Sequence, residues 1–89
     1  MLRITSLSQT KEAAVLKIEG RVAGSDVSLL EWEMKQKLQN ASCLVLELEG
    51  LKHIDREGLA VLKRWAGEKL ILRGGSTFVR TLLATHGLV

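Results

Sequence analysis

The sequence contains no proline, a single cysteine and only three aromatic residues among its 89 residues. Because one cysteine cannot form a disulfide within the chain, no internal cross-link supports the fold. No segment approaches the ~20 apolar residues that a membrane-spanning helix needs, and the first residues lack the apolar core of a signal peptide. We therefore expect one small cytoplasmic domain that does not insert into a membrane.

A predominance of one charge is also lacking. Thirteen basic and ten acidic side chains give a net charge of +3, and the signs alternate along the chain, as in Glu31, Glu33, Lys35 and Lys37. A nucleic-acid-binding face requires a cluster or a run of Lys and Arg, and neither is present. The charges predict a solvated mixed surface and no nucleic-acid partner.

Residues typical of catalysis or metal binding are scarce as well. His53 and His86 are the only histidines, and they lie in different segments without a cysteine or carboxylate pattern typical of a metal site. There is no Gly-x-Ser-x-Gly motif and no phosphate-binding loop. Glu47 and Glu49 share one face of an expected strand, but pairing of Glu47 with Lys17 across strands is simpler than an acid/base pair. We expect no metal, no cofactor and no enzymatic activity.

The apolar pattern predicts an opening hairpin followed by alternating helices and strands. Alternation over two segments joined by a short polar loop indicates antiparallel strands, and an i, i+3, i+7, i+11 stripe after Ser25 and Asp26 indicates an amphipathic helix. The expected elements are strands over 2–7 and 12–20, a helix over 27–39, a strand over 43–48, a helix over 55–66, a strand over 70–72 and a helix after 76. This β-β-α-β-α-β-α order predicts one α/β domain over residues 1–89, with a mixed sheet and helices packed on it; the strand order stays open.

The most informative segment joins the buried strand ending at Leu48 to the helix that begins at Asp55. The Asp55 carboxylate is placed to accept hydrogen bonds from free N–H groups at the positive end of that helix. Ile54 can pack against Leu59 as a hydrophobic staple. Gly58 lacks a side chain, so that another part of the chain or a partner can approach closely.

With these residues the sequence resembles the STAS family, the anti-sigma-factor antagonists and their relatives. In that family an apolar strand and a short loop precede Ile-Asp-Ser-Ser/Thr-Gly-Leu at the start of a helix. Ile54, Asp55, Gly58 and Leu59 match this frame. The strand and glycine of 70–74, the helix of 79–83 and the closing 86–88 agree with it too. The resemblance covers residues 12–89 and implies a non-enzymatic protein-binding module.

Two departures from the family pattern stand out. The family's phosphoacceptor is the first Ser after the Asp, where this chain has Arg56, and Glu57 stands at the second Ser/Thr position. Because arginine is no substrate for a serine kinase, we expect binding that phosphorylation does not switch; a role of Glu57 as a weak phosphate mimic stays open. By the same resemblance, the domain is expected to lack the family's last strand and helix.

The predicted partner-binding surface contains Asp55, Arg56, Glu57 and Gly58, together with Trp32. Trp32 lies off the apolar stripe of its helix and is expected to be half exposed, as interface anchors often are. By resemblance, the partner would be an anti-sigma factor or its serine-kinase relative. The alternative is an accessory subunit of a transporter ATPase or sensory complex, like the STAS-type subunits of bacterial lipid-trafficking transporters. The partner's identity and the oligomeric state stay open.

Overall fold

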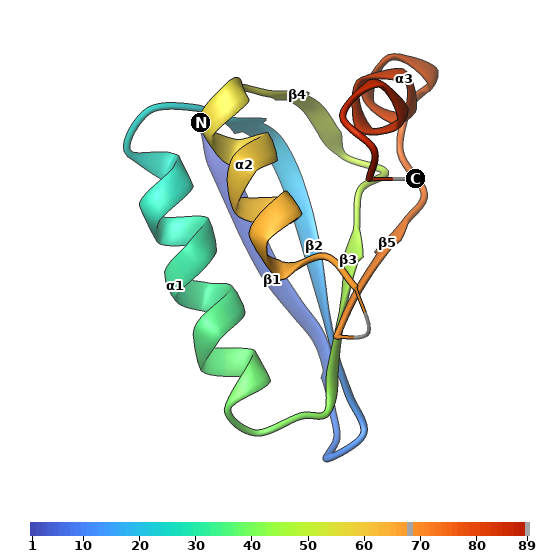
Figure 1. Ribbon diagram of the computed structural model, residues 1–89. Helices are drawn as coiled ribbons and strands as arrows, with labels where there is room; N and C mark the ends of the chain where they lie inside the picture. Colours follow the sequence, from blue (N-terminus) through green and yellow to red (C-terminus); the bar gives the residue numbers. More distant parts are fainter. Residues whose placement is uncertain (68, 89) are drawn as a thin grey trace.

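The computed structural model describes residues 1–67 and 69–88, which form a five-stranded mixed sheet and three helices (Figure 1). The fold class expected from the sequence is confirmed. In chain order the elements are β1 (Leu2–Gln9), β2 (Ala13–Val22), α1 (Asp26–Leu38), β3 (Cys43–Glu47), β4 (Leu51–Ile54), α2 (Arg56–Trp65), β5 (Leu70–Arg73) and α3 (Thr77–Thr85).

The sheet has the strand order β1-β2-β3-β5. β1 and β2 form the expected antiparallel hairpin, with Ile4 opposite Ile18. β2 pairs in parallel with β3, and β3 pairs in parallel with β5, so that Leu16, Leu46 and Leu72 lie side by side. A crossover helix connects the two strands of each parallel pair, α1 between β2 and β3 and α2 between β3 and β5. Because both crossovers run in the same direction across the sheet, both helices lie on the same face of it.

Strand β4 was not expected, because the segment between β3 and α2 had been interpreted as a loop. β2 has 10 residues and β3 only 5, so the last part of β2 has no partner on β3. β4 takes that place, with Val22 opposite Ile54 in a parallel register. The element order is therefore β-β-α-β-β-α-β-α. Only the long-range pairing with β2 makes these four residues a strand.

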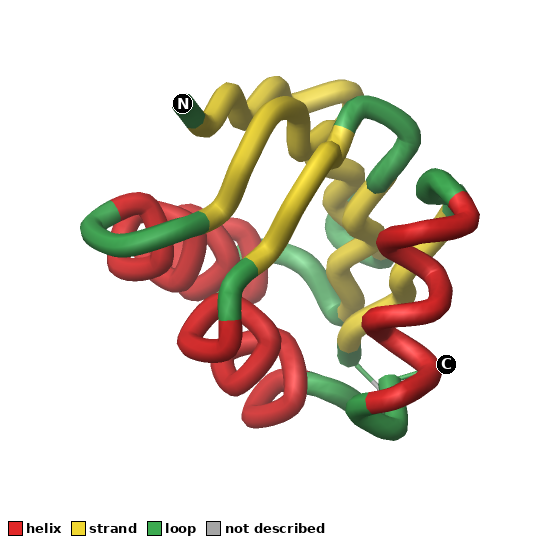
Figure 2. The backbone as a smooth tube through the Cα atoms, turned by 90° about the horizontal axis from the view of Figure 1, so that it is seen from above, coloured by secondary structure: helices red, strands yellow, loops and turns green. Residues whose placement is uncertain are grey.

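Helices α1 and α2 lie side by side and begin at the same end of the molecule, whereas α3 lies apart from them and contacts β4 (Figures 1 and 2). The core between the sheet and the helices is apolar, and no polar side chain is buried among the described residues. Its largest fully buried side chains come from β2, β3, β4, all three helices and the position just after β3: Leu16, Ile18, Leu30, Met34, Leu44, Leu46, Leu48, Ile54, Leu62 and Leu83.

Two polar contacts on the surface differ from what strand pairing alone suggests. Lys17 and Glu47 are neighbours in register, as expected. However, the Glu47 carboxylate accepts a hydrogen bond from Arg73 Nε at 2.7 Å, and Lys17 Nζ lies 3.8 Å from Glu19. The expected cross-strand pairing of Lys17 with Glu47 is therefore confirmed in register, but their side chains form no ion pair, because β5 places Arg73 on the other side of Glu47 with a charge-assisted contact.

One carboxylate ties α1 to α2. Glu31 Oε2 accepts hydrogen bonds from Arg64 Nη2 at 3.0 Å and from the indole Nε1 of Trp65 at 3.2 Å. Trp65 is therefore only partly buried, with its ring against the core and its N–H used between the helices. We refer to these three side chains as the Glu31 clamp.

Candidate functional site at the start of helix α2

The Asp55 carboxylate joins the start of α2 to the turn that precedes α1. Oδ1 accepts the Gly58 N–H at 2.8 Å, and Oδ2 accepts the Gly24 N–H at 3.2 Å. The Asp55 N–H donates to the carbonyl of Val22 at 3.0 Å. The prediction that Asp55 caps this helix is confirmed, and the second bond adds a connection between segments 31 residues apart.

The start of α1 is not capped by its own side chain. Ser25 occupies the cap position but makes no capping hydrogen bond with its hydroxyl. The first N–H groups of α1, from Asp26 and Val27, bond to the carbonyls of Ala23 and Gly24, while the Gly24 N–H in the preceding turn donates to Asp55. One carboxylate therefore caps α2 and also holds the turn that leads into α1.

Gly58 is buried beneath side chains of this chain. A Cβ atom at this position would lie 2.6 Å from Ile54 Cγ1 and 3.0 Å from Val22 Cγ1. The space that glycine leaves is thus filled by the end of β2 and by the residue before the cap. Gly58 contributes to the site by letting α2 begin close to the sheet, and Ile54 and Leu59 are both buried in the core there.

Arg56 and Glu57 form the exposed part of this helix end. Both side chains are solvent-exposed in the first turn of α2, and neither forms an ion pair with any other residue that the structure describes. Glu57 is favoured by the partial positive charge of the helix end, while Arg56 is disfavoured by it. The surface that α2 offers here therefore carries two fixed, opposite and unpaired charges.

A stacked aromatic pair, of which Phe78 is exposed and His53 partly buried, lies near this end of α2 and was missed in the sequence. The rings of His53 and Phe78 stack with their centroids 6.2 Å apart and an angle of 23° between their planes. Phe78 is 56% exposed although it belongs to a helix with an apolar inner face. The available signal was its position just before Val79, off the inner face, but its nearness to His53 in β4 depends on how α3 packs.

Trp32 is 57% exposed, as expected, but it lies on α1 rather than beside the start of α2. It is six residues beyond Asp26, roughly 9 Å along the helix axis. Leu29, three residues earlier on the same helix, is exposed as well. The structure thus brings Asp55, Arg56, Glu57 and Gly58 together and places Trp32 with Leu29 in a separate exposed patch.

The side chains gathered at this site are a capping carboxylate, one exposed cation and one exposed anion. In residues 1–67 and 69–88, no group of three His, Cys, Asp or Glu side chains is placed to hold a metal ion. The two histidines belong to different elements, His53 to β4 and His86 to the C-terminal cap of α3. None of the described helices has the length and apolarity needed to cross a bilayer.

Replacing Gly58 with alanine tests the close packing at this helix start. By helix propensity alone, alanine would stabilise the helix by up to ~1 kcal/mol. Because the added methyl group would overlap Ile54 and Val22, we instead expect the free energy of unfolding to fall by about 1–3 kcal/mol. Urea denaturation of the two proteins measures the difference, and a stabilised Gly58→Ala variant would contradict the packing described here.

Replacing Asp55 with alanine tests the shared cap. The variant leaves the N–H groups of Gly58 and Gly24 without their acceptor, so we expect a loss of about 1–2 kcal/mol in unfolding free energy. The matched control is Asp26→Ala, an acidic residue in the first turn of α1 that should cost only about 0.5 kcal/mol through the helix dipole. Equal losses in the two variants would show that the Asp55 hydrogen bonds contribute little.

The comparisons with known proteins agree with this geometry. A family model described as "Mlab, STAS domain" matches residues 5–89, so the match extends further toward the N-terminus than the motifs had indicated. No relative with a curated function was found for the chain.

Three solved structures share the fold. The anti-sigma factor antagonist SpoIIAA in its unphosphorylated form has a TM-score of 0.79 at 19% identity, covering 97% of this chain and 82% of that one. The Bacillus cell fate determinant SpoIIAA in the phosphorylated form has a TM-score of 0.69 at 18% identity, with 97% and 85% covered. An anti-sigma factor antagonist from Mycobacterium paratuberculosis has a TM-score of 0.70 at 21% identity, with 97% and 80% covered. The β-β-α-β-β-α-β-α fold, the Asp55 cap and the family match over residues 5–89 together show that this chain belongs to the STAS domain family.

Proposed function

We propose that the chain is a non-enzymatic regulatory module that binds another protein through the start of α2. The observation that carries this proposal is the exposed and unpaired state of Arg56 and Glu57. Arg56 gains nothing from the helix dipole and pairs with no described side chain, so folding gives no reason for a cation here. A partner's carboxylate would supply the missing interaction, and Glu57 would pair with a partner cation.

The surface around these charges has the features of an interface. Asp55 fixes the backbone of the first turn, and buried Gly58 keeps that turn close to the sheet. The exposed Phe78 ring, stacked on the partly buried His53, supplies aromatic area beside it, which interfaces favour. Trp32 with Leu29 is a second proposed contact, reached by a partner large enough to cover α1 as well.

Two partner classes fit this proposal. The solved neighbours are anti-sigma factor antagonists, which supports an anti-sigma factor or a related serine kinase as the partner, met in the cytoplasm. The matching family model is described as that of Mlab, and this favours the second class, in which the chain is an accessory subunit of a transporter ATPase. In either class the same helix end docks.

We further propose that phosphorylation does not switch this docking. SpoIIAA has been solved in an unphosphorylated and a phosphorylated form. In this chain positions 55–58 carry Asp55, Arg56, Glu57 and Gly58, none of which has a hydroxyl group. A phosphate brings about two negative charges, whereas Glu57 brings one that is always present. Docking is then constitutive or controlled elsewhere in the chain or on the partner.

A kinase assay tests the absence of the switch. After incubation with a cognate serine kinase and ATP, mass spectrometry should find no phosphate on the peptide that contains residues 55–58. The Arg56→Ser variant restores a hydroxyl at the start of the helix and should be phosphorylated, which shows that the kinase is competent. Stoichiometric phosphate within residues 55–58 of the natural chain would refute the proposal.

Affinity capture from native lysate tests the docking surface and identifies the partner class. We expect Arg56→Ala to weaken binding of the captured partner at least about tenfold, as truncation of an interface hot spot does. Lys63→Ala removes the same charge from the exposed far end of α2 and should leave the affinity unchanged. Equal affinities of the Arg56→Ala and natural proteins would place the interface elsewhere.

The Glu57→Gln variant separates the two roles considered for this residue. If Glu57 contacts the partner, the variant should bind more weakly than the natural chain. If Glu57 instead mimics a phosphate that opposes docking, the variant should bind more tightly. The sign of the change, measured by calorimetry with the identified partner, decides between them.

A further inference from the structure

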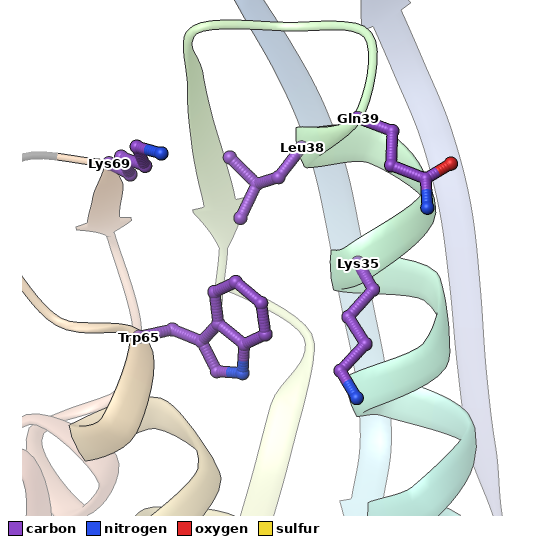
Figure 3. Close-up of a pocket in the computed structure, with 5 residues that line it drawn as sticks. All are labelled: Lys35, Leu38, Gln39, Trp65 and Lys69. Atoms are coloured by element: carbon purple, nitrogen blue, oxygen red, sulfur yellow. The ribbon is translucent and has the colours of Figure 1, made fainter.

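A pocket of about 270 Å³ lies between the C-terminal ends of α1 and α2 (Figure 3). These ends are at the opposite end of both helices from Asp55 and Arg56 (Figure 1). The pocket is lined by Lys35, Leu38, Gln39, Trp65 and Lys69. The pocket is therefore separate from the proposed docking surface and has a different composition.

The floor of the pocket is apolar and held in a fixed position. The Trp65 ring extends from α2 toward α1 and lies beside Leu38 (Figure 3). Its indole N–H donates to the Glu31 carboxylate at 3.2 Å, and this hydrogen bond fixes the direction of the ring. An aromatic ring held in this way offers a face for offset stacking without first having to be ordered.

Two lysines flank this floor and have no carboxylate partner among the described residues. Lys35 lies four residues after Glu31, a spacing at which a Glu–Lys pair would normally form on a helix. The Glu31 carboxylate is instead held by Arg64 and Trp65. Lys69 approaches from the other side, beyond Trp65 and Leu38 (Figure 3).

The helix ends account for only part of this positive charge. Each C-terminal end carries about half a negative charge, which favours nearby cations. Lys37 and Lys63 also lie in these last turns, whereas Arg64 is already paired with Glu31, so that the unpaired cations exceed what two helix ends offset. An anion in the pocket would balance the remainder.

We propose that this pocket binds a small aromatic carboxylate. The ring would stack on Trp65 and pack against Leu38, while the carboxylate would lie at the rim of the pocket, where the long, exposed side chains of Lys69 and Lys35 can each turn toward it. A volume of about 270 Å³ is at the lower end of the range for ligand pockets, so the ligand is of fragment size. A bare inorganic anion would leave the Trp65 face unused. The proposal does not rest on the proposed function.

The test uses the full chain in low salt with 4-phenylbutyrate as the probe and the indole N–H signal of Trp65 as the readout. The Trp32→Phe background leaves Trp65 as the only tryptophan and makes the assignment certain. We expect a saturable shift with 4-phenylbutyrate and binding about tenfold weaker for the neutral 4-phenylbutyramide. Inorganic phosphate should not displace the probe at equal concentration.

Three lysine-to-glutamine variants test the charges at the pocket, and all three positions are exposed, so the core is unchanged. Lys69→Gln and Lys35→Gln should each weaken binding of 4-phenylbutyrate about two- to fivefold, the range for an exposed ion pair. Lys63→Gln removes the same charge from an exposed position that does not line the pocket and should leave binding unchanged. The proposal is overturned by a shift that does not saturate, by equal binding of acid and amide, or by equal effects of Lys63→Gln and Lys69→Gln.

Discussion

The Asp55 carboxylate is the contact on which the arrangement of this domain depends. One of its oxygens binds the Gly58 N–H in α2, and the other binds the Gly24 N–H in the turn before α1. Its own N–H donates to Val22 at the end of β2. Four elements, β2, β4, α1 and α2, thus meet at one residue, and a short polar side chain holds together segments that the apolar core alone would leave free to shift along one another. The close fit of Gly58 against Ile54 and Val22 completes the junction, because any larger residue would move α2 away from the sheet.

Starting both helices at one point has a consequence for the charge distribution. Because α1 and α2 are parallel neighbours, their positive ends lie together at the Asp55 junction and their negative ends lie together at the Trp65 pocket (Figure 1). The acidic residues Asp26 and Glu57 are in the first turns, and the basic residues Lys35 and Lys63 are among those in the last turns. A sequence that alternates in sign therefore folds into a domain with two ends of different character. The Glu31 clamp joins the helices between these ends, and Arg56 opposes the field of its own helix.

The parts of this structure that could be predicted are those that local patterns determine. The alternation of apolar and polar residues in β2, and the apolar stripe with Leu30 and Met34 in α1, each arise within one element that faces the core. Asp55 likewise caps the helix that follows it directly in sequence. The features that were missed depend on contacts between distant segments. β4 is a strand only because β2 extends beyond β3 and offers it a partner, and Glu31 contacts Arg64 and Trp65 only because α1 lies beside α2. The stacking of Phe78 on His53 likewise follows from the packing of α3 against β4, which no spacing in the sequence shows.

The residues at the start of α2 also limit how the proposed docking could be regulated. Asp55, Arg56 and Glu57 together carry one net negative charge at neutral pH, and this charge is fixed by the sequence. A hydroxyl at the same place would let a kinase change the local charge by about two units, enough to alter a complex whose contacts are largely electrostatic. With Arg56 in that place, the proposed docking surface would present the same charge at all times. Any control of such a complex would then act on the partner, through the amount of either protein or through a separate site on this chain. The Trp65 pocket lies at the far end of the same two helices, which the Glu31 clamp connects.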